Sequence, residues 1–183
     1  MPAPRFKVAV SEKRIAQTVQ ELSGRIDRYA RANEISELSV VCVLDGAFIF
    51  CADLVRAMKT PTNIVFLKAR SYNGTRRGAL SLARLPEAMQ ARTVLVVDTV
   101  YDTGKTIAKV LREIRKQTSQ IALAVLVEKH GKAAAPASSL RGSPAIETFV
   151  GIRVPGDPFL VGYGLDVGGR FRHLKDIRIY SAP

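Results

Sequence analysis

The first apolar pattern along the chain has the spacing of an α-helix. Apolar side chains recur every three or four residues between mostly polar or charged positions, at Ile15, Val19, Leu22, Ile26 and Tyr29. Ser11 stands just before this pattern, and a serine hydroxyl can accept a hydrogen bond from the first turn of a helix. We therefore predict an amphipathic helix that begins after Ser11 and packs its apolar face against the core.

Four shorter segments are predicted to be buried strands. They are rich in apolar and β-branched residues and lack helical spacing, as in a parallel sheet that is covered on both faces. The four segments are Leu38–Leu44, Asn63–Ala69, Thr93–Val97 and Ile121–Val127. The third is followed directly by Asp98, where we expect the strand to end.

Helices are predicted to alternate with these strands. Asp45 and Gly46 interrupt the first strand, and Ala47–Met58 has the composition of a helix that returns from it. After Gly104, an amphipathic helix is marked by apolar residues at Ile107, Val110, Leu111 and Ile114. This alternation predicts an α/β fold with an open, mostly parallel sheet flanked by helices.

Two long segments show neither the spacing of a helix nor the apolar pattern of a strand: Arg70–Met89 and Lys129–Pro144. Loops of this length in a compact protein often act as lids or binding loops. A surface hairpin or an irregular excursion explains each segment equally well. The pattern leaves both interpretations open.

The composition predicts one compact domain spanning residues 1–183, because the chain is 47% hydrophobic and 24% charged. No apolar stretch is long enough to span a bilayer, and the first residues lack the apolar core of a signal peptide, so we expect a cytoplasmic protein without membrane contact. The two cysteines, Cys42 and Cys51, have neither a metal-ligand spacing nor a disulfide framework. We interpret both as small core residues.

The formal net charge of +12 favours an anionic partner. A phosphorylated substrate and a nucleic acid would both fit, and solvated basic faces without such a partner would give the same charge. The charge alone does not choose among them.

The segment Val94–Thr106 carries the strongest chemical signal, V-L-V-V-D-T-V-Y-D-T-G-K-T. In an open parallel sheet, ligands bind at the carboxyl ends of the strands, and this strand delivers Asp98 to that edge. The following turn, Asp102–Thr106, combines threonine hydroxyls with a glycine at the start of a helix, which suits a phosphate monoester. The acids beside it suit ribose hydroxyls or a hydrated Mg²⁺. An ordinary capped helix is the simpler alternative, and the glycine spacing of a nucleoside-triphosphate P-loop is missing.

The segment Val94–Thr106 resembles the phosphoribosyl diphosphate signature of the type I phosphoribosyltransferases. The rest of the chain is similar to their hypoxanthine-guanine branch. The further passages that carry this resemblance are Val43–Phe48 with Ala52–Leu54 for the pyrophosphate loop and its helix, Ser71–Tyr72 for the start of the mobile catalytic loop, Leu126–Lys129 for the strand end with the purine-contacting lysine, and Phe159–Asp166 with Phe171–Arg172 for the purine-stacking and C-terminal segment.

The resemblance implies a type I phosphoribosyltransferase fold with a small hood region formed by the termini. Within the single domain it implies a mobile loop at about residues 70–89 and a C-terminal hood and purine-binding segment at about residues 151–183. It also implies a homodimer or homotetramer.

The implied activity is transfer of the phosphoribosyl group from phosphoribosyl diphosphate to hypoxanthine or guanine in purine salvage, with Mg²⁺ as cofactor. Asp102 and Tyr72 would be catalytic, and Asp98 and Asp166 would bind the metal. Phosphoribosyl diphosphate would be bound by Asp98, Thr99, Asp102, Thr103, Gly104, Lys105, Thr106, Asp45, Gly46, Ser71 and Arg172. The purine would be bound by Lys129, Phe159, Leu160 and Asp166.

Two positions depart from the pattern of this family. Thr99 replaces the second of two adjacent acids, although its hydroxyl can still bond to a ribose oxygen. Asp45 stands where a basic residue is common, and its carboxylate would repel pyrophosphate unless it reaches a metal, pairs with a lysine or points away. The departures keep open a phosphoribosyltransferase for another base or a specialised pathway. The net charge keeps open, as an alternative, an RNA-binding regulator on the same fold. Our main hypothesis is an enzyme without a nucleic-acid partner.

Overall fold

The computed structural model describes residues 5–70, 81–82, 93–131, 137 and 146–182. The helices are α1 (Glu12–Ala32), α2 (Phe48–Ala57) and α3 (Lys105–Ile114). The strands are β1 (Arg5–Val10), β2 (Leu38–Leu44), β3 (Thr62–Arg70), β4 (Ser81–Leu82), β5 (Thr93–Tyr101), β6 (Gln120–His130), β7 (Glu147–Pro155), β8 (Leu160–Val161) and β9 (Ile177–Ser181).

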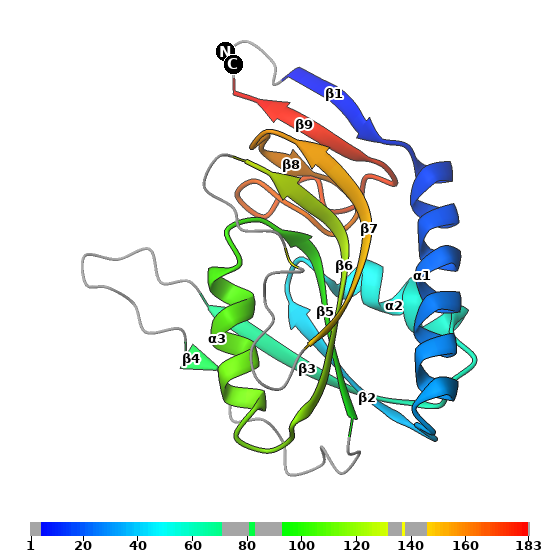
Figure 1. The fold of residues 1–183 in the computed structure, drawn as a ribbon. Coiled ribbons are helices and arrows are strands. Elements are labelled where there is room, and N and C mark those ends of the chain that lie inside the picture. The colour runs from blue at the N-terminus through cyan, green and yellow to red at the C-terminus, as the bar shows by residue number, and fades with distance from the viewer. Residues whose placement is uncertain (1–4, 71–80, 83–92, 132–136, 138–145, 183) are drawn as a thin grey trace.

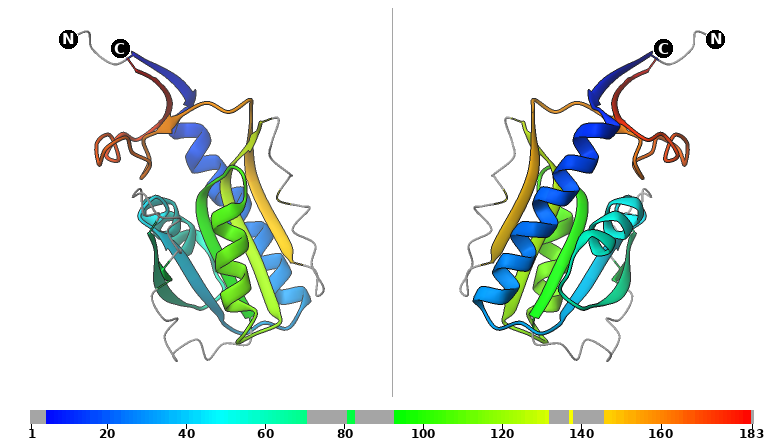
Figure 2. Two further views of the ribbon diagram at one scale, coloured as in Figure 1. Left: turned by 90° about the vertical axis from the view of Figure 1, so that its left-hand side faces the viewer. Right: turned by 90° about the vertical axis from the view of Figure 1, so that its right-hand side faces the viewer.

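The main sheet has the strand order β4-β3-β2-β5-β6-β7. All neighbours in it are parallel except β4, which pairs antiparallel with the end of β3. Helices α1 and α2 cover one face and α3 covers the other (Figures 1 and 2). The predicted open, mostly parallel α/β sheet is therefore confirmed.

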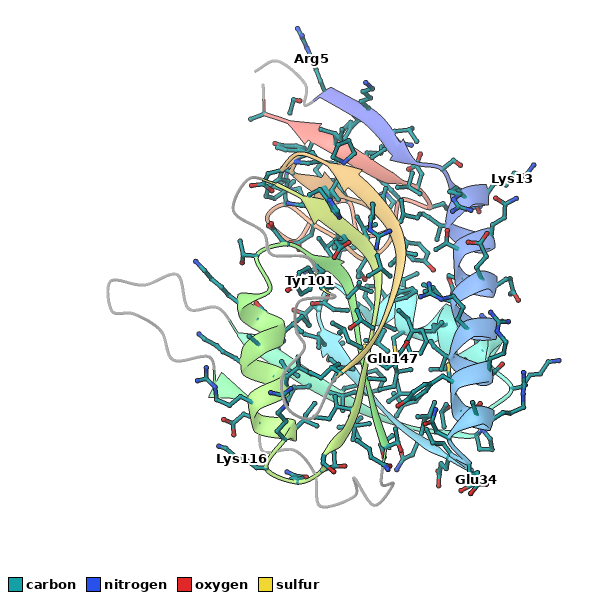
Figure 3. The ribbon with its side chains drawn as sticks, viewed as in Figure 1. Arg5, Lys13, Glu34, Tyr101, Lys116 and Glu147 are labelled. Carbon is teal, nitrogen blue, oxygen red and sulfur yellow. The ribbon has the colours of Figure 1, made fainter. Side chains whose placement is uncertain are left out.

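Each face of the sheet has its own apolar core, because successive side chains of a strand point to opposite faces. In β2, Val40 and Cys42 pack with α1 and α2, whereas Val41 and Val43 pack with α3. Cys51 of α2 is buried in the first of these cores, so both cysteines are core residues as predicted. Charged side chains such as Lys13 and Lys116 point away from the two cores (Figure 3).

A second, three-stranded sheet joins the two ends of the chain in the order β1-β9-β8. It lies beyond one end of the main sheet, with β1 and β9 side by side (Figure 1). Its central strand β9 pairs antiparallel with β1 and with β8. This sheet is the small hood that the resemblance implied.

Two strands extend further than predicted. β5 continues past Asp98 to Tyr101, because its pairing with β6 continues through Val100 and Tyr101. β6 likewise extends to His130. The segment Arg70–Met89, for which a surface hairpin and an irregular excursion both stayed open, contains β4, which pairs with Ala69 and Arg70. Across the part of the chain that the structure describes, no helix is long and apolar enough to cross a membrane.

Asp27 links α1 to the turn between α2 and β3. Its buried carboxylate accepts hydrogen bonds from the backbone N–H of Lys59 at 3.1 and 3.0 Å, and from the N–H and hydroxyl of Thr60 at 3.0 and 2.7 Å. Burial alone would raise the pKa of Asp27, but these hydrogen bonds outweigh it, and the pKa lies below its ordinary value.

Replacing Asp27 with asparagine is therefore expected to lower the free energy of unfolding at pH 7 by about 1–3 kcal/mol. A lowered pKa gives stability that is present above the unfolded-state value and lost as the pH falls, so the difference from wild type should shrink below about pH 4. Urea unfolding at pH 7 and pH 3 measures both. Glu21→Gln, which removes an exposed ion pair from the same helix, is the control and should change little. Equal effects of the two substitutions would contradict the role of Asp27.

Candidate active site

Asp98 lies near the carboxyl end of β5 and carries an unusual carboxyl group. The residue is half-buried, and its Oδ1 accepts a hydrogen bond from the backbone N–H of Thr99 at 2.7 Å. Burial raises the pKa of Asp98 to about 7, against the lowering effect of the backbone N–H groups of Thr99 and Val100. A carboxyl that is costly to ionise gains from a nearby cation or from hydroxyl donors, which suits a ligand or metal site.

The turn after β5 forms a small pocket of about 80 Å³. It is lined by Asp98, Val100, Tyr101, Asp102, Thr103, Gly104, Lys105, Thr106 and Ile107. Gly104 precedes α3 with a φ of 71°, and no side chain of a described residue caps the helix there. The N–H groups of the first turn therefore face a pocket that also carries two threonines and a lysine, which is the composition expected of a phosphate site.

Residue 104 has two reasons to be glycine: its positive φ and its closeness to Tyr101. A Cβ atom at Gly104 would lie 2.4 Å from the hydroxyl oxygen of Tyr101 and 2.8 Å from its ring. Tyr101 is buried in the core beneath α3 and cannot easily move. The tyrosine thus fixes the turn close against the strand that supplies Asp98.

Lys129 and Asp102 come together across the edge of the sheet. The Nζ atom of Lys129 lies 3.3 Å from Oδ2 of Asp102 and 2.8 Å from Oδ1 of Asp157. The lysine side chain is only 10% exposed, whereas Asp102 is 45% exposed. The arrangement offers a hydrogen-bond donor and an acceptor side by side. Both lie at the turn Asp102–Thr106, which we call the phosphate turn after its proposed ligand.

Asp166 and Arg172, which the sequence assigned to separate contacts, bind each other. Their ion pair measures 2.8 Å. Arg172 also donates to the carbonyl oxygen of Gly164 at 2.5 Å, and Asp166 accepts from the N–H of Gly169 at 2.6 Å. Both side chains are mostly buried, so the pair holds the C-terminal segment in shape.

Phe159 is 53% exposed, so its ring is not part of the core. It makes an edge-to-face contact with Tyr180, with the ring centroids 5.9 Å apart, and ring surface remains open for stacking. The neighbouring Leu160 is buried in β8 opposite Ile179, and its side chain belongs to the apolar core beneath α1 and α2.

Comparison with known proteins identifies the family. A family model for the phosphoribosyl transferase domain matches residues 10–156. The hypoxanthine phosphoribosyltransferase of Salmonella typhimurium is 34% identical, covering 92% of this chain and 91% of the relative. The hypoxanthine-guanine phosphoribosyltransferase of Mycobacterium avium is 32% identical, covering 98% and 90%. The chain belongs to the phosphoribosyl transferase domain family.

The fold agrees with solved structures of this family. The crystal structure of a hypoxanthine-guanine phosphoribosyltransferase from Bacillus anthracis superimposes with a TM-score of 0.78 at 27% identity. The match covers 97% of this chain and 99% of that one. The type I phosphoribosyltransferase fold predicted from the sequence is thus confirmed.

Thr99 makes a contact that was not predicted from the sequence. Its side chain is fully buried, and its hydroxyl donates to the carbonyl oxygen of Gly46 at 2.9 Å. The hydroxyl thus faces Gly46 in this structure, and its contact with a ribose oxygen stays a prediction. Because alternate side chains of a strand point to opposite faces, Asp98 remains beside the phosphate turn while Thr99 faces the loop after β2.

Replacing Thr99 with valine is expected to destabilise the protein by about 1–2 kcal/mol, because the Gly46 carbonyl loses its donor. If the loop at Asp45–Ala47 binds pyrophosphate, its affinity for pyrophosphate should also fall severalfold. Thermal unfolding and calorimetric titration with pyrophosphate measure the two effects. Thr148→Val, which removes a local hydroxyl contact to Ile146, is the control. Lost stability with unchanged pyrophosphate affinity would leave Thr99 a purely structural residue.

Asp45 pairs with a lysine. Its Oδ1 lies 3.7 Å from Nζ of Lys68, and both side chains are about half exposed. The charge of Lys68 offsets that of Asp45, so the carboxylate repels a bound anion less even without a metal. The backbone N–H of Ala47 donates to the carbonyl oxygen of Val43 at 3.4 Å, which leaves those of Asp45 and Gly46 to bind an anion.

Some predicted residues lie outside the described part of the chain, and one contact was missed. Ser71 and Tyr72 are among the residues that the structure does not describe. Asp157 was not predicted, because nothing in its sequence context distinguishes it from a solvated acid; only its 2.8 Å contact with Lys129 does so.

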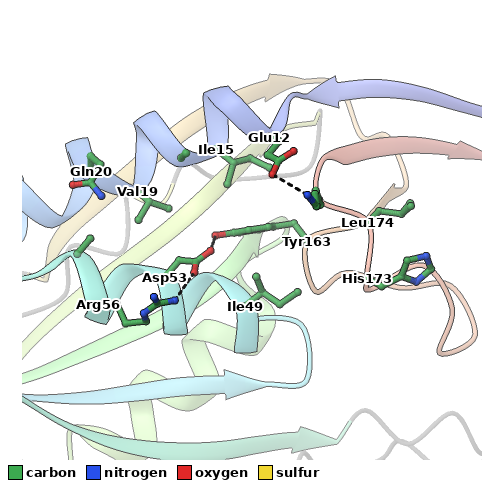
Figure 4. Close-up of a pocket in the computed structure, with 13 residues that line it drawn as sticks. Glu12, Ile15, Val19, Gln20, Ile49, Asp53, Arg56, Tyr163, His173 and Leu174 are labelled. Atoms are coloured by element: carbon green, nitrogen blue, oxygen red, sulfur yellow. Dashed lines mark hydrogen bonds and ion pairs between the residues drawn. The ribbon is translucent and has the colours of Figure 1, made fainter.

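A larger pocket of about 560 Å³ lies between α1, α2 and the C-terminal segment (Figure 4). None of the predicted site residues lines it. At its floor, the Tyr163 hydroxyl donates to Asp53 at 2.7 Å. Burial, and then the hydrogen bond and charge of Asp53, raise the pKa of Tyr163. The pair therefore joins the hood to α2 and adds nothing to the phosphate turn.

Proposed function

We propose that this chain transfers the 5-phosphoribosyl group from phosphoribosyl diphosphate to hypoxanthine or guanine, giving IMP or GMP and pyrophosphate. The observation that carries the proposal is the contact between Lys129 and Asp102 beside the phosphate turn. A 6-oxopurine presents an exocyclic oxygen, which accepts hydrogen bonds, and a ring N–H, which donates one. Lys129 and Asp102 offer the two complementary groups. The relatives named above act on hypoxanthine, or on hypoxanthine and guanine.

Each part of the substrate has residues suited to it. The 5′-phosphate binds at the start of α3, where Thr103, Thr106 and the free N–H groups meet it. Asp98 accepts hydrogen bonds from the ribose hydroxyls. The base stacks on the exposed ring of Phe159 and directs its oxygen to Lys129.

Asp102 takes or holds the proton of the purine ring as the new bond to the ribose forms. Pyrophosphate leaves along the loop at Asp45–Ala47, whose free backbone N–H groups hold it, and Arg172 adds positive charge on that side. Tyr72, in the loop predicted to close over the substrate, excludes water from the reactive ribosyl group.

Mg²⁺ is the cofactor in this proposal. Among the described residues, no group of three or more acidic, histidine or cysteine side chains is placed to hold a metal. Mg²⁺ bound with a phosphorylated substrate needs only one or two protein carboxylates, and the rest of its ligands are water and phosphate oxygens. Asp98 fits this role, since its carboxyl gains from a cation, whereas Asp166 is already paired with Arg172. The metal would stabilise the charge that develops on pyrophosphate.

We also propose that residues 1–183 work as one domain, with the loop near residues 70–89 closing over the substrate and the segment from about residue 151 completing the base site. Assembly as a homodimer or homotetramer is part of the proposal, and light scattering on the purified protein tests it.

Incubation with phosphoribosyl diphosphate, Mg²⁺ and a panel of bases tests the function. Hypoxanthine, guanine, xanthine, adenine and uracil are supplied separately, and the nucleotide products are separated by chromatography. IMP or GMP is the expected product, and Lys129→Met should reduce its formation, whereas Lys13→Met on the surface of α1 should not. Turnover of a different base, as the changes at Asp45 and Thr99 leave open, would overturn the choice of 6-oxopurines.

A further inference from the structure

Glu128 is a buried carboxylate that has no part in the proposed chemistry. It precedes Lys129 on β6 and is 1% exposed. Its Oε1 accepts a hydrogen bond from the backbone N–H of Ala137 at 2.6 Å. Its Oε2 lies 3.0 Å from Nε of Arg153 and 3.0 Å from Nε2 of His130.

The carboxylate is held firmly in its charged form. Burial alone would raise the pKa of Glu128, but the hydrogen bonds from Ala137, His130 and Arg153, together with the charge of Arg153, lower it below its ordinary value. Removing one partner of a buried charge costs far more than the pair contributes. The position of Glu128 is therefore tightly determined by its partners.

These partners come from different segments of the chain. Arg153 lies on β7 directly opposite Glu128 in the strand register, and His130 lies at the end of β6. Ala137 is fully buried and packs in the core beneath α3. Glu128 thus ties the end of β6 to its neighbouring strand and to residue 137.

The same strand end carries Lys129. Adjacent residues of a strand point to opposite sides, so Glu128 anchors the backbone from within while Lys129 reaches out to Asp102 and Asp157. A lysine side chain is long and flexible, and both of its acidic partners are exposed, so the direction of its ammonium depends on where its backbone is held.

We propose that Glu128 is a positioning residue for base recognition, which fixes the strand end so that Lys129 meets the base beside Asp102. The inference rests on the proposed function for the identity of the base. A positioning role predicts a selective loss of contacts to the base, whereas a purely structural role predicts lost stability without that selectivity.

The test compares two ligands that share a phosphate and a ribose. IMP carries the base and ribose 5-phosphate does not, so the ratio of their affinities isolates the base contacts. In Glu128→Gln the amide nitrogen would meet the Arg153 donor, and the strand end should shift. Because misplacement by about 1 Å can cost on the order of 10²-fold, we expect IMP affinity to fall about tenfold, with ribose 5-phosphate affinity unchanged. In turnover, KM for the base should rise while KM for phosphoribosyl diphosphate stays the same.

Arg153→Gln provides a gentler variant in case Glu128→Gln does not fold. Arg153 is 65% exposed, and the backbone N–H of Ala137 still donates to Glu128 in this variant, so a smaller shift in the same direction is expected. Arg14→Gln, which breaks an exposed pair with Glu21, is the matched control. An equal loss of both ligands in the Glu128 and Arg153 variants, or no loss of either, would overturn the positioning role. If the wild-type protein binds IMP no better than ribose 5-phosphate, the proposed base site itself fails, and this outcome is separate from any effect of Glu128.

Discussion

Asp102→Asn is expected to lower the turnover number with a 6-oxopurine by about 10²- to 10⁴-fold, the usual contribution of a positioned proton acceptor. The amide cannot take a proton from the purine ring. The Kd for phosphoribosyl diphosphate should change by less than about threefold, because the proposed partner of Asp102 is the base. Pre-steady-state turnover and equilibrium binding of phosphoribosyl diphosphate separate the two quantities.

Asp157→Asn is the matched control for this experiment. Asp157 is the other carboxylate in contact with Lys129, yet it is 68% exposed and has no role in the proton transfer. Its substitution should alter KM for the base modestly and leave turnover nearly unchanged. If the Asp102 and Asp157 variants lose turnover equally, the effect lies in holding Lys129, and Asp102 is not the proton acceptor.

Asp98→Asn is expected to stabilise the metal-free protein at pH 8 while it weakens phosphoribosyl diphosphate binding. A carboxyl whose pKa rises from 3.8 to about 7 on folding binds its proton more tightly in the folded state. Folding therefore loses stability as the pH rises between these values, by on the order of 2–4 kcal/mol. Asparagine does not titrate, so the variant avoids this loss.

Urea unfolding between pH 4 and pH 8, without metal, measures the effect. The advantage of the variant over wild type should be smallest near pH 4 and should grow up to pH 7. Asp157→Asn, at an exposed acid, is the control and should show no such trend. A constant difference across the pH range would show that folding does not raise the pKa of Asp98.

The interior of the sheet was predictable because it depends on local pattern. Leu38–Leu44 is apolar throughout, since both of its faces are covered, and it matches β2 residue for residue. The extension of β5 to Tyr101 was not predictable, because it depends on pairing with β6. β1, β8 and β9 were likewise invisible to periodicity and were expected only as a hood implied by the resemblance.

In the site, sequence reasoning singled out the turn Asp102–Thr106, whose members are adjacent in the chain and line one pocket; its binding of phosphate stays a prediction. It did not anticipate that the Thr99 hydroxyl bonds to Gly46, because Gly46 lies 53 residues away. For the same reason it missed Asp157 and did not anticipate that Glu128 binds Ala137, His130 and Arg153. Contacts between distant segments decide which oxygen atom is free to meet a ligand, and pattern alone does not contain them.

The pairing of the two chain ends has a consequence for biosynthesis. The main sheet is complete once residue 155 has been made, whereas the three-stranded sheet also needs β9, its central strand. The N–H of Tyr180 in β9 donates to the carbonyl oxygen of Phe159 at 2.8 Å. The position of Phe159, whose ring is proposed to stack on the base, therefore also depends on β9. A chain that lacks β9 can thus form the turn Asp102–Thr106 while the proposed base site is still incomplete.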